Sequence, residues 1–211
     1  MRKPPASPQA RDTIATPHPL TEQLIDRLGA GSGDRVLDYA SGSGRNTAAL
    51  RDAGVTVVAI DDQRAACPTT LADVDEAFDA VLSTHGLLHG NVPAVATNLH
   101  WIADHLKMDG LLYATFGSSR DARFGKGTRI DASTFAPIDG DERGVPHTYF
   151  DERQVRSLLA VEFEVESLQE RGVDEVVGSW AHRKRALRGA VHWFIVARKR
   201  YCAETAVVTA R

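Results

Sequence analysis

A short glycine-containing loop lies between a strand-like run and a helix-like run early in the chain. The apolar run 35–39 is typical of a buried strand, and residues 45–52 have helical character. The loop between them, Ala40-Ser41-Gly42-Ser43-Gly44, contains glycines that let the backbone pass close to a ligand. The start of the following helix offers unpaired N–H groups to such a ligand. This unit constrains the chain to an α/β fold with a candidate binding loop.

Strand-like and helix-like runs continue to alternate after this unit. The expected strands are 55–60, 78–83, 111–116, 163–168 and 191–197. Helices are expected at 20–28, 45–52 and 94–107 and after Asp151, which forms an N-cap pattern with Gln154. Short connections between alternating elements predict a Rossmann-like, doubly wound sheet that is mostly parallel, with an antiparallel last strand.

The 211 residues are expected to form one domain with a tail at each end. Residues 1–19 are rich in proline and predict an N-terminal tail or arm. Residues 20–200 predict the domain, and residues 201–211 a C-terminal tail. Within the domain, 117–150 has little periodicity and predicts a lid-like insertion, because long loops of this kind are usually functional or disordered.

Composition excludes several classes of protein. The chain has 25 basic and 28 acidic residues, so its net charge of −3 argues against a nucleic-acid partner. No apolar run approaches the roughly 20 residues of a membrane-spanning helix, and the N-terminus lacks a secretory pattern. Cys67 and Cys202 are too few for a disulfide framework. A cytoplasmic protein without membrane partners is expected.

The position of an acidic residue narrows the ligand of the glycine loop. Asp61 ends the strand expected after the loop, where a carboxylate can accept hydrogen bonds from both hydroxyls of a ribose. A dinucleotide fingerprint requires glycine where Thr47 stands, and a P-loop requires Gly-Lys-Ser/Thr where 44–46 reads Gly-Arg-Asn. The pattern therefore predicts a nucleoside-containing ligand but disfavours NAD and P-loop nucleotides.

Asp38 precedes Gly42 by four residues, and this acidic-x-x-x-G-x-G pattern resembles motif I of the class I S-adenosylmethionine-dependent methyltransferases. Residues 106–112 resemble the turn before the fifth strand of that family, and 78–84 resemble its fourth strand. Residues 44–46 and 83–85 look most like tellurite-resistance-type and related small-molecule methyltransferases. The resemblance implies S-adenosylmethionine as cofactor and S-adenosylhomocysteine as product.

The resemblance also implies a set of donor-binding residues. In the family, the acidic residue matching Asp38 orients the amino end of the donor, and Asp61 would bind its ribose. The full expected set is Asp38, Ala40, Ser41, Gly42, Gly44, Asn46, Asp61, Asp62, Asp73, Val74, Ser83 and Thr84. Ala40 and Asp62 depart from the family pattern. The short stretch after Asp61 predicts an abbreviated third strand region, in which Asp73 either contacts adenine or is a solvated carboxylate.

Acceptor residues are expected in loops at the carboxyl ends of the strands. Methyl transfer is an in-line displacement that needs a base only when the acceptor must lose a proton. The expected catalytic residues are His85, His147 and Tyr149, and the expected substrate-binding residues are His89, Arg120, Arg123 and Phe124. The histidines could instead cap helices, and the arginines could pair with nearby carboxylates. No metal site is predicted, because no carboxylate completes a set with His85 and His89.

These patterns together predict methyl transfer to a small molecule with an O, N, S or chalcogen nucleophile. One alternative is a catalytically silent S-adenosylmethionine-binding or regulatory module. Another is an RNA or protein methyltransferase, which the negative charge disfavours. The strand at 78–83 is also not followed by the Asp/Asn-Pro-Pro-Tyr motif of such enzymes. A monomer or homodimer is expected.

Overall fold

The computed structural model describes residues 16–61, 77–140, 142–172 and 189–200. The helices are α1 (Pro19–Leu28), α2 (Arg45–Asp52), α3 (Val92–His105) and α4 (Glu152–Leu159). The strands of the first half are β1 (Arg35–Tyr39), β2 (Thr56–Ile60), β3 (Phe78–Ser83) and β4 (Leu106–Ser118). The later strands are β5 (Thr128–Arg129), β6 (Thr134–Ala136), β7 (His147–Phe150), β8 (Phe163–Gly172) and β9 (Val191–Lys199).

The central sheet has the order β2-β1-β3-β4-β9-β8. Strands β2, β1, β3 and β4 are parallel, whereas β9 runs antiparallel to both β4 and β8. Because parallel strands require crossover helices, both faces of this sheet are covered. The Rossmann-like, mostly parallel sheet predicted from the sequence, with its antiparallel last strand, is confirmed.

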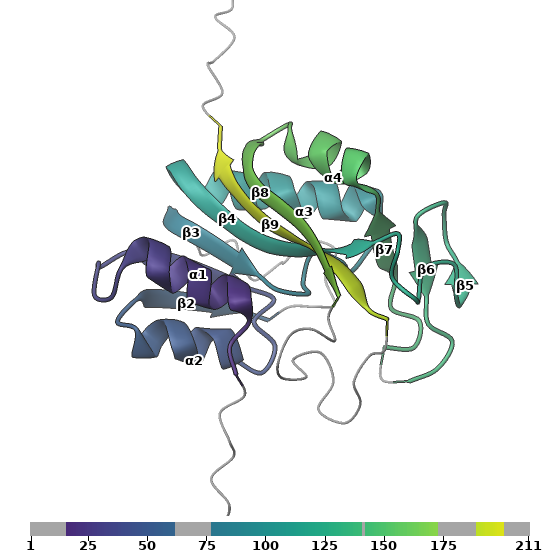
Figure 1. Cartoon of the computed structure of the whole chain (residues 1–211), viewed down its shortest axis with the longest axis horizontal. Helices are drawn as coiled ribbons and strands as arrows, with labels where there is room; N and C mark the ends of the chain where they lie inside the picture. Colours follow the sequence, from purple (N-terminus) through teal and green to yellow (C-terminus); the bar gives the residue numbers. More distant parts are fainter. Residues whose placement is uncertain (1–15, 62–76, 141, 173–188, 201–211) are drawn as a thin grey trace, which may run out of the picture.

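Each face of the sheet carries its own hydrophobic core. Helices α1 and α2 cover one face and α3 and α4 the other (Figure 1). Neighbouring residues of β1 point to opposite faces, so Val36 packs with the α1 and α2 side chains and Leu37 with those of α3 and α4. Both residues are fully buried. The continuous apolar run of β1 follows from this two-sided burial.

The boundary between α3 and β4 differs from the prediction. The helix ends at His105, and Leu106 already begins β4, where a helix had been expected to continue to Lys107. Asp109 has a φ of 60°, and the pairing of β4 with β3 shifts register nearby. The Asp-Gly pair is therefore a bulge inside one long strand and not a turn before it.

The segment 117–150 is more regular than expected. Strands β5, β6 and β7 form a small antiparallel sheet, and β7 also pairs in parallel with the end of β4 (Figure 1). The expectation of little regular structure was wrong, because these strands are only two to four residues long and carry no periodic signal. The capping box predicted at Asp151 and Gln154 is confirmed at the start of α4.

Several predictions concern residues outside the described ranges. These are the donor contacts of Asp62, Asp73 and Val74, the abbreviated third strand region, most of the N-terminal tail and the C-terminal tail. No helix in the described part of the chain is long and apolar enough to cross a membrane.

Candidate functional site

The glycine loop turns sharply between β1 and α2. Ala40, Gly42 and Gly44 all have positive φ, at 59°, 55° and 76°. The Ser41 N–H donates to the Ile60 carbonyl at 2.9 Å, which joins the loop to the end of β2. Gly44 is the N-cap of α2, and no side chain of the described residues caps this helix start. Its first N–H groups are therefore placed to bind a ligand.

Asp38 lies beneath this loop at the end of β1. It is 1% exposed and accepts a 2.5 Å hydrogen bond from the Thr47 hydroxyl of α2. Burial raises the pKa of Asp38, and the bond from Thr47 opposes that rise. The positive charge of the Arg45 guanidinium also lowers the pKa of Asp38. Burial lowers the pKa of Arg45 itself to about 10. A buried carboxyl in this position suits the cationic amino end of a ligand.

Asn46 ties the loop to two other segments. Its side-chain N–H donates to the Thr84 hydroxyl at 2.8 Å, and its oxygen accepts the His18 N–H at 3.0 Å. The His18 ring in turn caps α1 by accepting the Leu20 N–H at 3.1 Å. Asn46 therefore connects the binding loop, the end of β3 and the segment before α1.

Two further donor candidates lie at the same edge of the sheet. Asp61 is exposed immediately after β2, where its carboxylate can accept hydrogen bonds from a ligand. Ser83 ends β3, and its hydroxyl is buried without a hydrogen-bond partner among the described residues. An unsatisfied buried hydroxyl is unfavourable unless a ligand or water pairs with it.

His85 follows β3 at this edge, where the sequence predicts the acceptor side. Its φ is 67°, and its N–H donates to the Thr115 hydroxyl of β4 at 2.8 Å. The ring centroid of His85 lies 4.8 Å from that of His192 and 5.7 Å from that of His18. Burial lowers the pKa of His18 and of His192 to about 3, and that of His85 well below its usual value. The three rings are therefore neutral at pH 7.

The two predicted substrate-binding arginines already have acidic partners. Arg123 donates to both oxygens of Asp121, at 2.9 and 3.0 Å, and its Nη2 lies 3.2 Å from His192 Nε2. Asp121 also accepts the N–H of Val191. Arg120 pairs with Glu170 and is largely exposed. Arg123 therefore links β9 to the 117–150 segment. Its contact with His192 places the guanidinium next to the ring pair of His85 and His192.

Phe124 and Tyr149 belong to an aromatic cluster in the small sheet. The ring centroid of Phe124 lies 5.3 Å from Phe135 and 5.9 Å from Tyr149. Burial raises the pKa of Tyr149 to about 12, so its phenol stays protonated at neutral pH. A protonated phenol can donate a hydrogen bond but cannot take a proton from a ligand.

The two remaining histidine candidates meet at a carboxylate. His147 Nε2 lies 3.2 Å from Glu142 Oε2, and His89 Nε2 lies 3.9 Å from Glu142 Oε1. The two imidazole rings beside it hold the pKa of Glu142 well below its usual range. The sequence analysis considered only a carboxylate beside His85 and His89, whereas the Glu142 carboxylate lies beside His89 and His147, because the 117–150 segment folds back against the loop after β3. His85, in contrast, lies with His18 and His192.

Four residues of these clusters had not been assigned to the site from the sequence. They are His18, Thr47, Glu142 and His192. The Pro-His-Pro run before α1 was a usable signal for His18, because a cap residue precedes a helix that begins with proline. No local pattern marks the other three.

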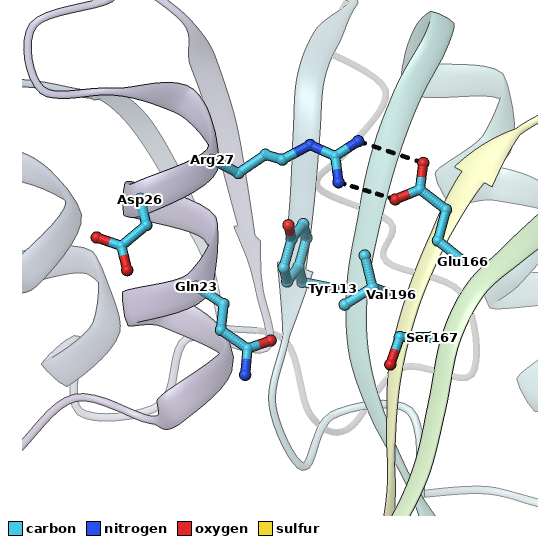
Figure 2. Close-up of a pocket in the computed structure, with 7 residues that line it drawn as sticks. All are labelled: Gln23, Asp26, Arg27, Tyr113, Glu166, Ser167 and Val196. Atoms are coloured by element: carbon cyan, nitrogen blue, oxygen red, sulfur yellow. Dashed lines mark hydrogen bonds and ion pairs between the residues drawn. The ribbon is translucent and has the colours of Figure 1, made fainter.

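A separate groove of about 510 Å³ opens between α1 and the strands β4, β8 and β9 (Figure 2). Arg27 spans it and donates to Glu166 at 2.9 Å. Tyr113 and Gln23 line the same groove. It contains none of the candidate donor or acceptor residues, so it is not the site described above.

A family model described as a methyltransferase domain matches residues 15–167, which is more than half of the chain. The match spans the glycine loop, Asp61 and His85. Fold and site together define a class I, S-adenosylmethionine-dependent methyltransferase. The chain belongs to this methyltransferase-domain family.

Two curated relatives are the demethylmenaquinone methyltransferases of Renibacterium salmoninarum and Beutenbergia cavernae. They are 36% and 39% identical over matches that cover 35% and 34% of this chain. The same matches cover 38% and 36% of the relatives, so the chain spans little more than a third of their length.

Solved structures extend the similarity to most of the chain. The 1,6-didemethyltoxoflavin-N1-methyltransferase of Burkholderia thailandensis, with bound 1,6-didemethyltoxoflavin and S-adenosylhomocysteine, is 25% identical with a TM-score of 0.59. The similarity covers 86% of this chain and 76% of that one. An S-adenosylmethionine-dependent methyltransferase from Methanosarcina mazei shares the fold, with a TM-score of 0.56 at 18% identity, over 83% of this chain and 96% of that one.

The buried His18 predicts a specific acid sensitivity. Its pKa is 6.5 when unfolded and about 3 when folded, so between these values only the unfolded chain binds the proton. The contribution of neutral His18 to the free energy of unfolding is fully present above pH 6.5. It is lost as the pH falls below that value, by about 1.4 kcal/mol per pH unit. The variant His18→Asn keeps a side chain that can cap α1. Between pH 6 and pH 4, we expect its free energy of unfolding to fall less steeply than that of the unsubstituted chain, by about 1.4 kcal/mol per pH unit.

Urea denaturation at several pH values measures this effect. His100→Asn is the control, because exposed His100 has its pKa raised by Glu162 and contributes stability with the opposite sign. An acid slope that is the same in His18→Asn as in the unsubstituted chain contradicts the prediction.

Proposed function

We propose that this chain transfers a methyl group from S-adenosylmethionine to a small-molecule nucleophile. One observation carries the proposal: the glycine loop, Asp61 and the His85 segment meet at the carboxyl edge of one parallel sheet. In open α/β sheets this edge is where ligands bind. The catalytically silent donor-binding module is the second candidate, and turnover separates the two.

The residues at this edge fit the donor. The uncapped start of α2 and buried Asp38 suit the carboxylate and amino groups of its methionine portion. Exposed Asp61 suits the ribose hydroxyls, and the unsatisfied Ser83 hydroxyl offers a further polar contact. When bound, S-adenosylmethionine supplies a methyl group on a positively charged sulfur.

The proposed acceptor side combines neutral histidines with the aromatic cluster of Phe124, Phe135 and Tyr149. Neutral His85 can accept a proton from an acceptor as its nucleophile becomes acidic during transfer. A neutral ring also avoids repulsion with the cationic donor. Arg123 and Phe124, beside His192 and Tyr149, are proposed to shape the acceptor cavity. Arg120, His147 and Tyr149 stay candidate acceptor contacts.

The class of acceptor is inferred from charge and from the relatives. Relatives of this chain are named for methylation of demethylmenaquinone and of 1,6-didemethyltoxoflavin, which are small molecules. The net charge of −3 supports a small acceptor over a nucleic acid. The acceptor atom, O, N, S or chalcogen, and the tellurite-resistance-type resemblance stay predictions.

Donor binding and turnover test the proposal. We expect the chain to bind S-adenosylmethionine but not NAD in calorimetric titrations, and to form S-adenosylhomocysteine with members of a panel of small nucleophiles. Asp61→Ala should weaken donor binding about 10- to 100-fold, because two hydrogen bonds to a charged group are lost. Its exposure leaves unfolding free energy unchanged.

Asp52→Ala is the matched control, because Asp52 is also an exposed aspartate and ends α2. Its donor affinity should equal that of the unsubstituted chain. Donor binding without turnover on any acceptor favours the silent module, and binding of NAD alone excludes both readings.

A further inference from the structure

We infer that His89, Glu142 and His147 form a binding site for one divalent transition-metal ion, of which Zn²⁺ is the best match. One ligand atom from each residue lies within 4.8 Å of the other two. Two imidazoles and one carboxylate are a ligand set that Zn²⁺ uses with a fourth position open. This inference does not depend on the proposed methyl transfer.

The orientation of the His147 ring identifies a cation position. His147 Nδ1 lies 2.8 Å from the Val145 carbonyl, which can only accept, so Nδ1 carries the proton. In the neutral ring Nε2 then presents a lone pair to Glu142 Oε2, 3.2 Å away. Two acceptors that face each other repel unless a metal ion or a proton lies between them. A ligating histidine typically donates its other N–H to a carbonyl in this way.

A single metal ion serves this cluster better than protons do. The His89 and His147 ring centroids are only 4.9 Å apart, so two imidazolium rings would repel each other. One divalent ion neutralises Glu142 and accepts lone pairs from both neutral rings. Bonds of about 2.0–2.1 Å to a tetrahedral ion separate ligand atoms by roughly 3.3 Å, close to the observed 3.2 and 3.9 Å.

Backbone pairing holds the two histidines in place. His89 and His147 form an isolated β-bridge, and the Gly90 N–H donates to the Pro146 carbonyl at 2.9 Å. The Thr148 hydroxyl donates to the Gly90 carbonyl at 2.6 Å. His147 is 2% exposed, whereas the Glu142 side chain is 33% exposed and can close onto an ion. The proposed metal site therefore joins the 117–150 segment to the loop after β3.

The test is metal binding by the untagged, chelator-stripped full chain. We expect calorimetric titration with Zn²⁺ to give one ion per chain, and Co²⁺ to give the visible absorption of a tetrahedral site. Glu142→Gln and His147→Ala should each weaken Zn²⁺ binding at least 100-fold. Glu142→Gln is the decisive variant, because its partial exposure preserves the fold even if the buried His147 variant unfolds.

His100→Ala is the matched control. His100 is an exposed histidine beside the two carboxylates Glu162 and Asp104, but its two nitrogens point to different partners. This variant should bind Zn²⁺ like the unsubstituted chain. Absence of Zn²⁺ binding, or binding that survives Glu142→Gln, overturns the inference and leaves a protonated histidine–carboxylate pair.

Discussion

Gly86→Ala is expected to lower donor affinity at least 10-fold and the free energy of unfolding by about 1–3 kcal/mol. A methyl group on Gly86 would lie 2.5 Å from the Ala40 side chain and 2.8 Å from the Ser83 hydroxyl. Neither neighbour withdraws easily, because Ala40 is held at a positive φ and Ser83 is buried. We therefore expect the added methyl group to displace the glycine loop from the end of β3.

Gly33→Ala separates this collision from the general effect of replacing glycine. Gly33 has a φ of 80° and nothing within 4 Å of the added atom, so the substitution introduces backbone strain of about 1 kcal/mol without a contact. Thermal unfolding and calorimetric titration with S-adenosylmethionine compare the two variants. Equal donor affinity in both would refute the steric role of Gly86.

The sequence predicted those parts of the fold that local signals control. The strands β1 and β3 and helix α2 have the expected bounds, because buried apolar runs and glycine turns mark their ends. The capping box of α4 was equally readable. The donor residues predicted between Asp38 and Asn46 follow from the same signals, since their positions depend on one strand, one turn and one helix.

The acceptor side could not be read in the same way. Glu142 meets His89 only because β7 pairs with the end of β4 beyond the last residue of β3. The contact between Arg123 and His192 joins residues 69 positions apart. Such contacts depend on tertiary pairing between short strands. The pattern of a single segment does not determine it.

The proposed acceptor side is therefore where substitution is most informative, and we predict that His85 contributes more to the reaction than the other candidate residues do. We expect His85→Asn to reduce turnover at least 100-fold for acceptors that must lose a proton, in line with the usual contribution of a positioned base. Asparagine tolerates the φ of 67° at this position, so the variant keeps the loop conformation that alanine would strain. Donor affinity should change less than threefold.

The direction of this effect follows from the chemistry of the two side chains. The neutral ring of His85 offers a lone pair, whereas the asparagine amide is too weak a base to take a proton from the acceptor. Steady-state formation of S-adenosylhomocysteine, measured beside calorimetric donor titration, separates catalysis from binding. The same change at exposed His100 should leave both quantities unaltered. If His85→Asn turns over proton-bearing acceptors at the original rate, methyl transfer in this chain depends on positioning alone and His85 is not its base.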